Sequence, residues 1–141
     1  MSTIVLQLEN AAIYQRDNLV LSGVNLTLNK GDFCYLIGKT GSGKSSLMKT
    51  LYGDLFLKKG TGSIVDFDLT KLKEKEIPFL RRKIGIVFQD FKLLSDRNVF
   101  DNLKFVLKAT GWKDKELMKE KIYEVLDKVG LKSQYYKKTF E

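Results

Sequence analysis

The chain has 141 residues, of which 43% are hydrophobic and 30% charged, a composition typical of one globular domain with a buried core. Twenty-five Lys and Arg against 17 Asp and Glu give a formal net charge of +8, and there is no histidine. Histidine-based acid–base catalysis and histidine metal ligation are therefore excluded within the chain. The sequence shows no transmembrane run and no secretory leader, and one cysteine cannot form an internal disulfide, so we expect a cytoplasmic protein.

The excess positive charge allows three kinds of partner: nucleic acid, an anionic membrane surface or a phosphorylated ligand. Residues 73–83 and 113–121 alternate in sign, as solvated helix faces do. No nucleic-acid recognition motif is visible, so nucleic acid is not an expected partner.

Hydrophobic periodicity predicts an α/β order of elements along the chain. Strands are expected at 4–9, 19–28, 33–37, 63–67 and 84–88, and helices at 44–52 and from Pro78. Residues 33–37 (FCYLI) and 84–88 (IGIVF) are almost wholly apolar, which is typical of parallel-sheet strands covered on both faces. From about Asn98 the spacing becomes helical, and two amphipathic helices are expected, separated by Gly111.

A glycine-rich motif lies between the apolar run 33–37 and the first expected helix. Residues 38–45, Gly-Lys-Thr-Gly-Ser-Gly-Lys-Ser, match G-x-x-x-x-G-K-[ST], the P-loop pattern. Such a match arises by chance in roughly 0.5% of chains of this length at average amino-acid frequencies. The glycines let successive main-chain N–H groups face phosphate oxygens, and the following helix points its positive end at them. The sequence therefore predicts nucleotide binding.

Two side chains of the motif have specific expected roles. Lys44 reaches the β- and γ-phosphates as a mobile charge, and the Ser45 hydroxyl is an oxygen ligand for Mg²⁺. The residues predicted to bind the nucleotide are Gly38, Lys39, Thr40, Gly41, Ser42, Gly43, Lys44, Ser45 and Ser46.

Several segments together carry a resemblance to a known family. These are Tyr14 before the P-loop, Ile77-Pro78-Phe79-Leu80-Arg81-Arg82, the run RKIGIVFQD ending at Gln89-Asp90, and residues 93–102 (LLSDRNVFDN). Their order resembles the nucleotide-binding domain of ABC ATPases, in particular its bacterial cell-division branch, from about residue 4 to the end. The resemblance implies a P-loop NTPase core of the ABC type with an N-terminal β subdomain. Residues 1–90 would form this ATP-binding α/β core, and residues 91–141 would begin the helical subdomain.

The resemblance also implies roles for residues outside the P-loop. Tyr14 matches the aromatic residue that stacks on adenine, although a tyrosine on a strand surface or in a core has the same pattern. Gln89 matches the glutamine that contacts Mg²⁺ or the attacking water and senses the γ-phosphate, and a polar residue ending a strand is the alternative. Lys44 and Gln89 are the expected catalytic residues, Ser45 and Gln89 the expected metal ligands, and ATP and Mg²⁺ the expected cofactors.

The sequence departs from the family pattern in several places. It contains no LSGGQ-like signature, no apolar run ending in Asp-Glu and no switch histidine, and the family pattern argues against Asp90 as the missing acid. Residues 60–77 are shorter than usual, so a trimmed hairpin is expected around Asp66-Phe67-Asp68. The chain stops at about the position where the signature would begin. We therefore expect a fragment truncated before the signature, which binds ATP but hydrolyses little or none.

The expected function is that of an ATP-binding subunit of an ABC-type ATPase in cell division. The resemblance implies a head-to-tail homodimer in the full-length protein and a position on the inner face of the cell membrane, bound to an integral-membrane partner. Phe91, Leu93 and Leu94 could contact that partner or belong to a core. The alternatives are the ATPase of another ABC transporter or lipoprotein exporter, a small P-loop kinase, and a non-catalytic ATP sensor or basic nucleic-acid binder. Cys34 is expected only to pack inside its strand.

Overall fold

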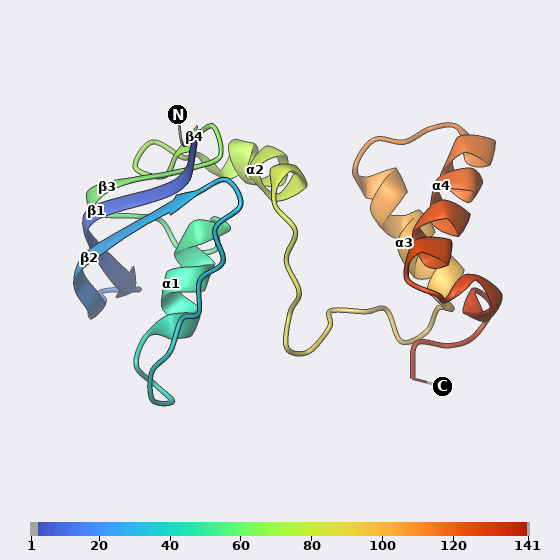
Figure 1. Ribbon diagram of the computed structural model, residues 1–141, viewed down its shortest axis with the longest axis horizontal. Helices are drawn as coiled ribbons and strands as arrows, with labels where there is room; N and C mark the ends of the chain where they lie inside the picture. Colours follow the sequence, from blue (N-terminus) through green and yellow to red (C-terminus); the bar gives the residue numbers. More distant parts are fainter. Residues whose placement is uncertain (1–2, 141) are drawn as a thin grey trace. The chain divides into compact units, whose positions relative to one another are not determined.

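The computed structural model describes residues 3–140, and the chain divides into two compact units at Gly85/Ile86. The first unit contains β1 (Ile4–Gln15), β2 (Asn18–Asn29), α1 (Lys44–Leu51), β3 (Lys59–Ile64), β4 (Phe67–Asp68), a 3₁₀ turn (Glu74–Glu76) and α2 (Ile77–Lys83). The second contains α3 (Val99–Ala109), α4 (Lys115–Lys128) and a 3₁₀ turn (Lys132–Gln134) (Figure 1). Each unit is described by itself.

The first unit is built on a four-stranded antiparallel sheet in the order β2-β1-β3-β4. The expected strand at 4–9 continues to Gln15 through an irregularity in register after Leu8. Asn10 adopts a left-handed backbone there (φ 46°), and Ala11 and Ala12 are both buried, as a bulge allows. A hairpin is present near residue 66, with Ser63 opposite Asp68. The expected strand at 63–67 is wrong, because β3 ends at Ile64, Val65 has a left-handed backbone (φ 53°), and β4 begins at Phe67.

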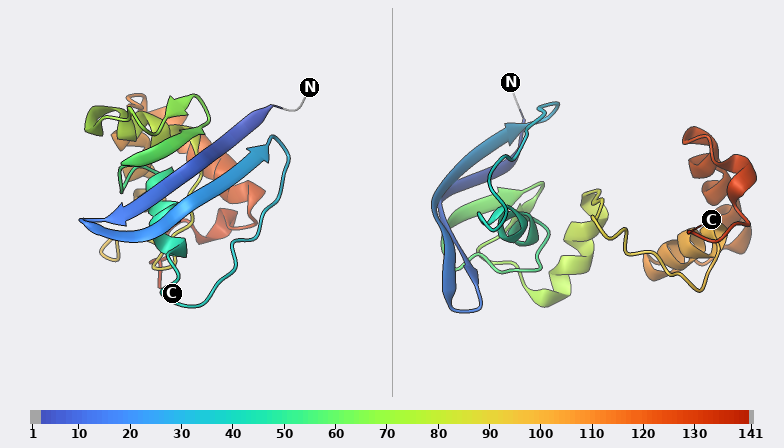
Figure 2. Two further views of the ribbon diagram at one scale, coloured as in Figure 1. Left: turned by 90° about the vertical axis from the view of Figure 1, so that its left-hand side faces the viewer. Right: turned by 90° about the horizontal axis from the view of Figure 1, so that it is seen from below.

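Helix α1 covers one face of this sheet (Figures 1 and 2). The core between them consists of leucine, isoleucine and alanine side chains from β1, α1, α2 and the connecting segments: Leu6, Leu8, Ala11, Ile13, Leu47, Leu51, Leu57, Leu69, Leu72 and Leu80. Burial of these side chains is the main stabilising contribution to the unit. It holds α1, and with it the loop that precedes α1, against the sheet.

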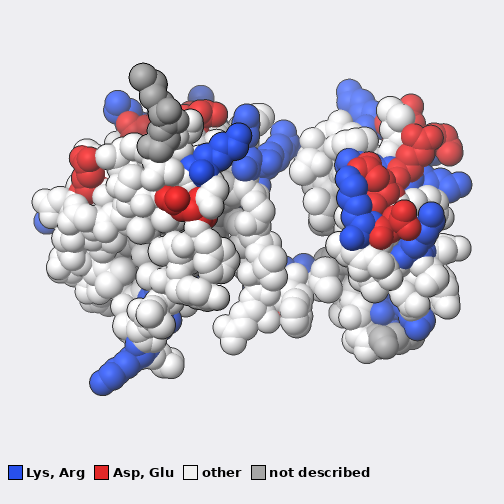
Figure 3. Space-filling model, in the orientation of Figure 1, with Lys and Arg blue, Asp and Glu red and all other residues white. Residues whose placement is uncertain are grey.

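The second unit is a pair of helices joined through Gly111, as the sequence predicts. Met118, Ile122 and Leu126 of α4 are its buried apolar residues, and their spacing is that of one helix face. On the face of this unit seen in Figure 3, acidic and basic side chains lie next to each other. Among residues 3–140, none of the helices has both the length and the apolar character needed to cross a bilayer.

The expected strands at 33–37 and 84–88 are not formed. Both segments belong to no strand of the sheet, and Phe33, Ile37 and Val87 are 80%, 90% and 93% exposed. A buried parallel strand needs neighbouring strands for its main-chain hydrogen bonds and covering elements on both faces. Within the described part of the chain, the sheet does not extend to these segments. The expectation that Cys34 packs inside a strand is also wrong, because its side chain is exposed.

Candidate functional site

The glycine-rich loop 38–43 leads directly into α1, whose observed start at Lys44 confirms the expected helix. Gly41 and Gly43 adopt left-handed backbone conformations (φ 80° and 91°), which glycine reaches without steric penalty. A Cβ atom on Gly43 would lie 2.8 Å from Leu21 Cγ and 3.0 Å from Val20 Cγ1. The loop therefore packs closely on β2 at this point, and a larger residue would push it away.

The Lys44 side chain folds back onto the loop that precedes it. Its Nζ donates hydrogen bonds to the carbonyl oxygens of Gly38 (2.6 Å) and Lys39 (2.7 Å), with a longer contact of 3.4 Å to Ser42 Oγ. The Ser42 N–H donates to the Lys39 carbonyl at 3.1 Å. An ammonium group is thus held at the loop, next to the positive end of α1, where it favours an anion.

The first turn of α1 has no side-chain cap. Gly43 stands at the N-cap position, and no acidic residue occurs in the first turn. Ser45 is exposed, whereas Ser46 is buried and its carbonyl accepts a hydrogen bond from the Thr50 hydroxyl at 3.0 Å. Because first-turn N–H groups lack partners inside a helix, this end of α1 can donate hydrogen bonds to a bound anion.

Tyr14 lies in β1, opposite Leu19 of β2, close in sequence to the β2 residues that contact Gly43. The Nζ atoms of Lys58 and Lys59 lie 5.6 Å and 5.9 Å from the centroid of the Tyr14 ring. The ring is half-buried and is bordered by two cations. The sequence did not predict this arrangement, because the adjacent lysines at 58 and 59 give no indication of which aromatic ring they lie beside.

Gln89 lies in a turn of the second unit and is exposed, so it is not among the residues that the first unit brings together. The next residues form a tight turn in which Phe91 and Lys92 have positive φ (55° and 51°). The Asp90 carboxylate pairs with Lys92 Nζ at 2.6 Å. The hydrogen bond from Lys92 lowers the pKa of Asp90, with a smaller opposing effect of burial. The view that Asp90 is not the missing acid rests on the family resemblance and stays a prediction.

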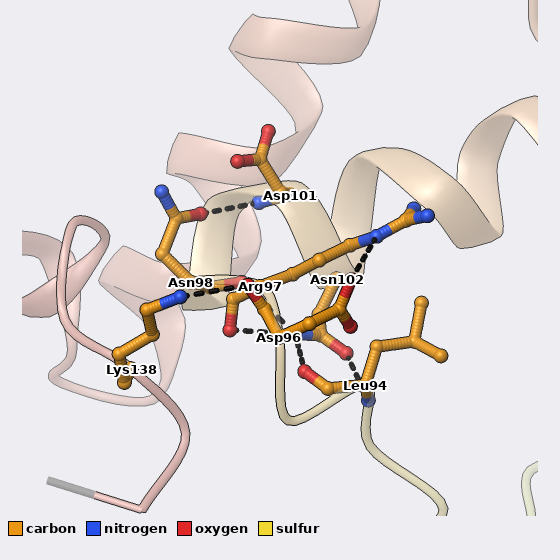
Figure 4. Close-up of polar contacts among 7 residues, drawn as sticks. All are labelled: Leu94, Asp96, Arg97, Asn98, Asp101, Asn102 and Lys138. Carbon is orange, nitrogen blue, oxygen red and sulfur yellow. Dashed lines mark hydrogen bonds and ion pairs between the residues drawn. The ribbon is translucent and has the colours of Figure 1, made fainter.

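The apolar residues after Gln89 have unequal environments. Phe91 and Leu93 are 71% and 52% exposed, whereas Leu94 is partly buried. Leu94 is held by the side chain of Asn102 (Figure 4), which accepts a hydrogen bond from the Leu94 N–H and donates one to its carbonyl. Sequence reasoning did not identify Asn102. The available signal was one amide residue within the apolar spacing of the helix that begins near Asn98.

The residues described contain no group of three or more His, Cys, Asp or Glu side chains that could hold a metal ion. The expected ligands of a magnesium ion, Ser45 and Gln89, carry a hydroxyl and an amide oxygen and are not among these residue types. The exposed Ser45, next to Lys44 at the start of α1, is compatible with this role, since Mg²⁺ accepts few protein ligands and retains water and phosphate oxygens.

Comparison with known proteins gives concordant results. Residues 21–140 match the family model described as ABC transporter. The chain is 46% identical over 112 residues to the cell division ATP-binding protein FtsE of Bacillus subtilis, covering 79% of this chain and 49% of the relative. It is 39% identical over 135 residues to the methionine import ATP-binding protein MetN of Helicobacter pylori, covering 94% and 40%.

The fold agrees with these matches. The ATP-binding cassette MJ0796, solved as a dimer in a post-hydrolysis state bound to ADP and Pi, superposes with a TM-score of 0.80 at 26% identity over 96% of this chain and 62% of that one. The expected fold class is thereby confirmed. The chain spans about half or less of the length of the curated relatives it matches, from 40% to 51%.

Proposed function

The chain belongs to the ABC transporter family, and on that premise we propose that it is the ATP-binding part of an ABC-type ATPase. The observation that carries the proposal is the start of α1, where an uncapped first turn follows a glycine loop into which Lys44 already directs its ammonium group. This arrangement suits the phosphates of a nucleotide.

The proposed roles follow from the chemistry of each side chain. Lys44 exchanges its contacts with the Gly38 and Lys39 carbonyls for phosphate oxygens, which are stronger acceptors because they are charged. Ser45 would supply a protein ligand for Mg²⁺, which when bound would neutralise phosphate charge. Tyr14 presents a ring for the base, with Lys58 and Lys59 beside it. Gln89 would contact Mg²⁺ or the attacking water and sense the γ-phosphate, as the family resemblance implies.

The finer proposal is an FtsE-like ATPase that couples ATP binding and hydrolysis to an integral-membrane partner of the FtsX type in cell division. The match to FtsE of Bacillus subtilis supports it. In this proposal the full-length protein forms a head-to-tail homodimer at the inner face of the membrane. These 141 residues contain no signature, catalytic base or switch histidine. Because phosphoryl transfer depends on such positioning groups, the chain by itself binds ATP and hydrolyses little or none.

A second candidate is the ATPase of another ABC transporter, and the relative that favours it is an import protein. The match to MetN of Helicobacter pylori extends over 94% of this chain, further than the match to FtsE. Co-purification from native membranes distinguishes the two: an FtsX-like protein supports the cell-division assignment, whereas a substrate-import permease supports the alternative.

Titration calorimetry with Mg-ATP tests nucleotide binding. We expect the wild-type chain to bind, and Lys44→Ala to weaken binding by roughly 10- to 100-fold, because a charged hydrogen-bond donor is lost. Lys49→Ala is the matched control, since Lys49 lies on the same helix but pairs with Asp54 at 3.7 Å. Absence of binding to the wild-type chain, or equal weakening by both substitutions, would contradict the proposal.

A further inference from the structure

The main-chain N–H groups in the first turn of α3 find acceptors in Asn98, which precedes α3, and in the segment that follows α4. The N–H groups of Val99 and Phe100 donate to the carbonyls of Lys137 (3.0 Å) and Tyr135 (2.9 Å). The Asp101 N–H donates to Asn98 Oδ1 at 2.7 Å, and the Asn102 N–H donates to the Asn98 carbonyl at 3.0 Å. The chain itself therefore satisfies the main-chain donors that a helix start normally leaves open.

The Asn102 side chain holds the segment that precedes α3. It is only 8% exposed, and its Oδ1 accepts from the Leu94 N–H at 2.8 Å. Its Nδ2 donates to the carbonyls of Leu94 and Asn98, both at 3.0 Å, and makes a longer contact of 3.4 Å with the main-chain carbonyl of Arg97. Figure 4 shows this side chain pointing into the turn formed by residues 94–98. Only an amide of this length supplies one acceptor and two donors at one position.

The C-terminal segment contacts the same turn from the other side. Lys138 Nζ donates to the Asp96 carbonyl at 2.7 Å (Figure 4), and Asn98 and Lys138 form an isolated β-bridge. The ring of Tyr135 lies edge-on to that of Tyr123 in α4, with centroids 5.5 Å apart. Residues 94–98 and 135–138 thus share contacts through the start of α3. We call this set of contacts the α3 clamp.

We propose that Asn102 is a positioning residue of the α3 clamp, which makes residues 94–98 and 135–138 move as one body. Residues 94–98 follow Gln89, so a displacement of Gln89 would be transmitted to the C-terminal segment rather than absorbed in the turn. This consequence rests on the proposed function of Gln89. The clamp itself does not, because its hydrogen bonds need no nucleotide.

A purely local role for Asn102 makes a different prediction from a clamp. If Asn102 served only its own turn, losing it would free residues 94–98 and leave 135–138 unaffected. In the clamp, the two segments share the first turn of α3, and each stabilises the other. Coupling of this kind is reciprocal, so a change on either side must be detected on both.

Hydrogen–deuterium exchange on the full 141-residue chain, without nucleotide, tests the clamp. Asn102→Asp keeps the acceptor for Leu94 but removes both donors. We expect exchange to accelerate roughly tenfold or more at residues 94–98. We expect the same at the amides of Val99 and Phe100, whose acceptors are the main-chain carbonyls of Lys137 and Tyr135, respectively. Lys138→Met, a milder change, is expected to accelerate exchange at 94–98 as well. Lys137→Met is the matched control, because only the main chain of Lys137 has a described contact in the clamp.

Further readouts separate positioning from general loosening. The amides around Met118, Ile122 and Leu126 in α4 should keep their protection in the Asn102 and Lys138 variants, and the double variant should show a non-additive effect. Equal acceleration throughout α4, or effects of Lys138→Met confined to residues 135–138, would overturn the clamp.

A parallel measurement at saturating Mg-ATP tests the link to Gln89. Exchange at 94–98 and 135–138 should change together in the wild-type chain and separately in Asn102→Asp. A change in only one segment of the wild-type chain, or in neither, overturns the link. Failure to bind Mg-ATP overturns the proposed function instead, and leaves the nucleotide-free comparison of variants to decide on the clamp.

Discussion

Helices α1 and α3 both begin after a turn, but their first-turn N–H groups have different surroundings. Before α1 stand Gly43, which has no side chain, and a loop held by the Lys44 ammonium group. Before α3 stands Asn98, whose side chain caps the helix, and two carbonyls from the C-terminal segment complete the turn. A helix end satisfied by its own chain has few donors left for a ligand, whereas an uncapped one keeps them.

The two ends also differ in charge. The first turn of α1 contains no carboxylate, whereas that of α3 contains Asp101. A carboxylate at this position stabilises the helix through its dipole and repels an anion. The N–H groups at the start of α3 therefore have partners within the chain, whereas those at the start of α1 lack a side-chain cap. The missing cap lowers the stability of α1, and burial of Leu47 and Leu51 in the core offsets this loss.

The largest expected effect is at the open end. Gly43→Ala would place Cβ 2.8 Å from Leu21 Cγ on a left-handed backbone. We expect the free energy of unfolding of the first unit to fall by about 1–3 kcal/mol, and Mg-ATP affinity to fall with it. Urea unfolding followed by far-ultraviolet circular dichroism, together with calorimetry, measures both. Gly85→Ala is the control, because a Cβ there meets no atom within 4 Å. Unchanged stability and affinity in Gly43→Ala would remove the steric argument.

The closed end should respond in stability alone. Asn98→Ala removes the 2.7 Å cap to the Asp101 N–H, which should cost about 0.5–2 kcal/mol without changing Mg-ATP affinity. Fluorescence of Trp112, the single tryptophan of the chain, follows unfolding of the second unit. Asn98→Asp keeps the capping oxygen and should retain most of the stability. A loss of nucleotide affinity in Asn98→Ala would break the contrast between the two helix starts.

A carboxylate introduced at the open end sharpens the contrast further. Ser45→Asp should stabilise the nucleotide-free chain by about 0.3–1 kcal/mol through the α1 dipole, yet weaken Mg-ATP binding by repulsion. Thermal unfolding with and without nucleotide measures the two effects. The stabilisation should shrink as salt is added, and Ser45→Asn should lack it. Destabilisation of the nucleotide-free chain by Ser45→Asp would contradict the view that the first-turn N–H groups of α1 are available to an anion.

The smallest expected effect concerns surface charge on α4. Hydrogen bonds from Lys121 and Lys128 lower the pKa of Glu124 from 4.5 to about 2. Because the folded-state pKa is the lower one, the pair stabilises the fold above pH 4.5 and loses this contribution as the pH falls from 4.5 to about 2. Glu124→Gln should therefore reduce the Trp112-detected melting temperature slightly at pH 7 and not at pH 2. The exposed Glu120 provides the control, Glu120→Gln. An equal reduction at both pH values would exclude the ion pair as its cause.

The features that depend only on residues close together in the sequence could be predicted from it. The glycine spacing of residues 38–43 and the helix that begins at Lys44 follow from backbone preferences within a few residues. The same holds for Pro78 at the start of α2 and for the two helices on either side of Gly111. The family could also be recognised, since the run RKIGIVFQD and the P-loop stand in a fixed order. The roles of Tyr14, Gln89 and the loop residues stay predictions.

The strands predicted at 33–37 and 84–88 illustrate why apolar composition alone is insufficient. An apolar run indicates that a segment avoids water, but a strand exists only where another strand accepts its hydrogen bonds. Ile37 and Val87 are almost fully exposed, so the tendency of these two segments to avoid water is not satisfied within residues 3–140. Composition carries no information about where a pairing partner lies.

By itself, the amino-acid order determined the glycine-rich loop, the helices and the family, because each depends on neighbours in the chain or on a motif of a few residues. Only the tertiary structure decided that Lys44 rests on the Gly38 and Lys39 carbonyls and that lysines border Tyr14. It also decided that the Asn102 side chain holds Leu94 and that the Phe100 N–H donates to the Tyr135 carbonyl. These contacts depend on segments distant in sequence meeting in space. Hydrogen-bond geometry and burial, which no local pattern encodes, select among the many pairings that the same side chains could form.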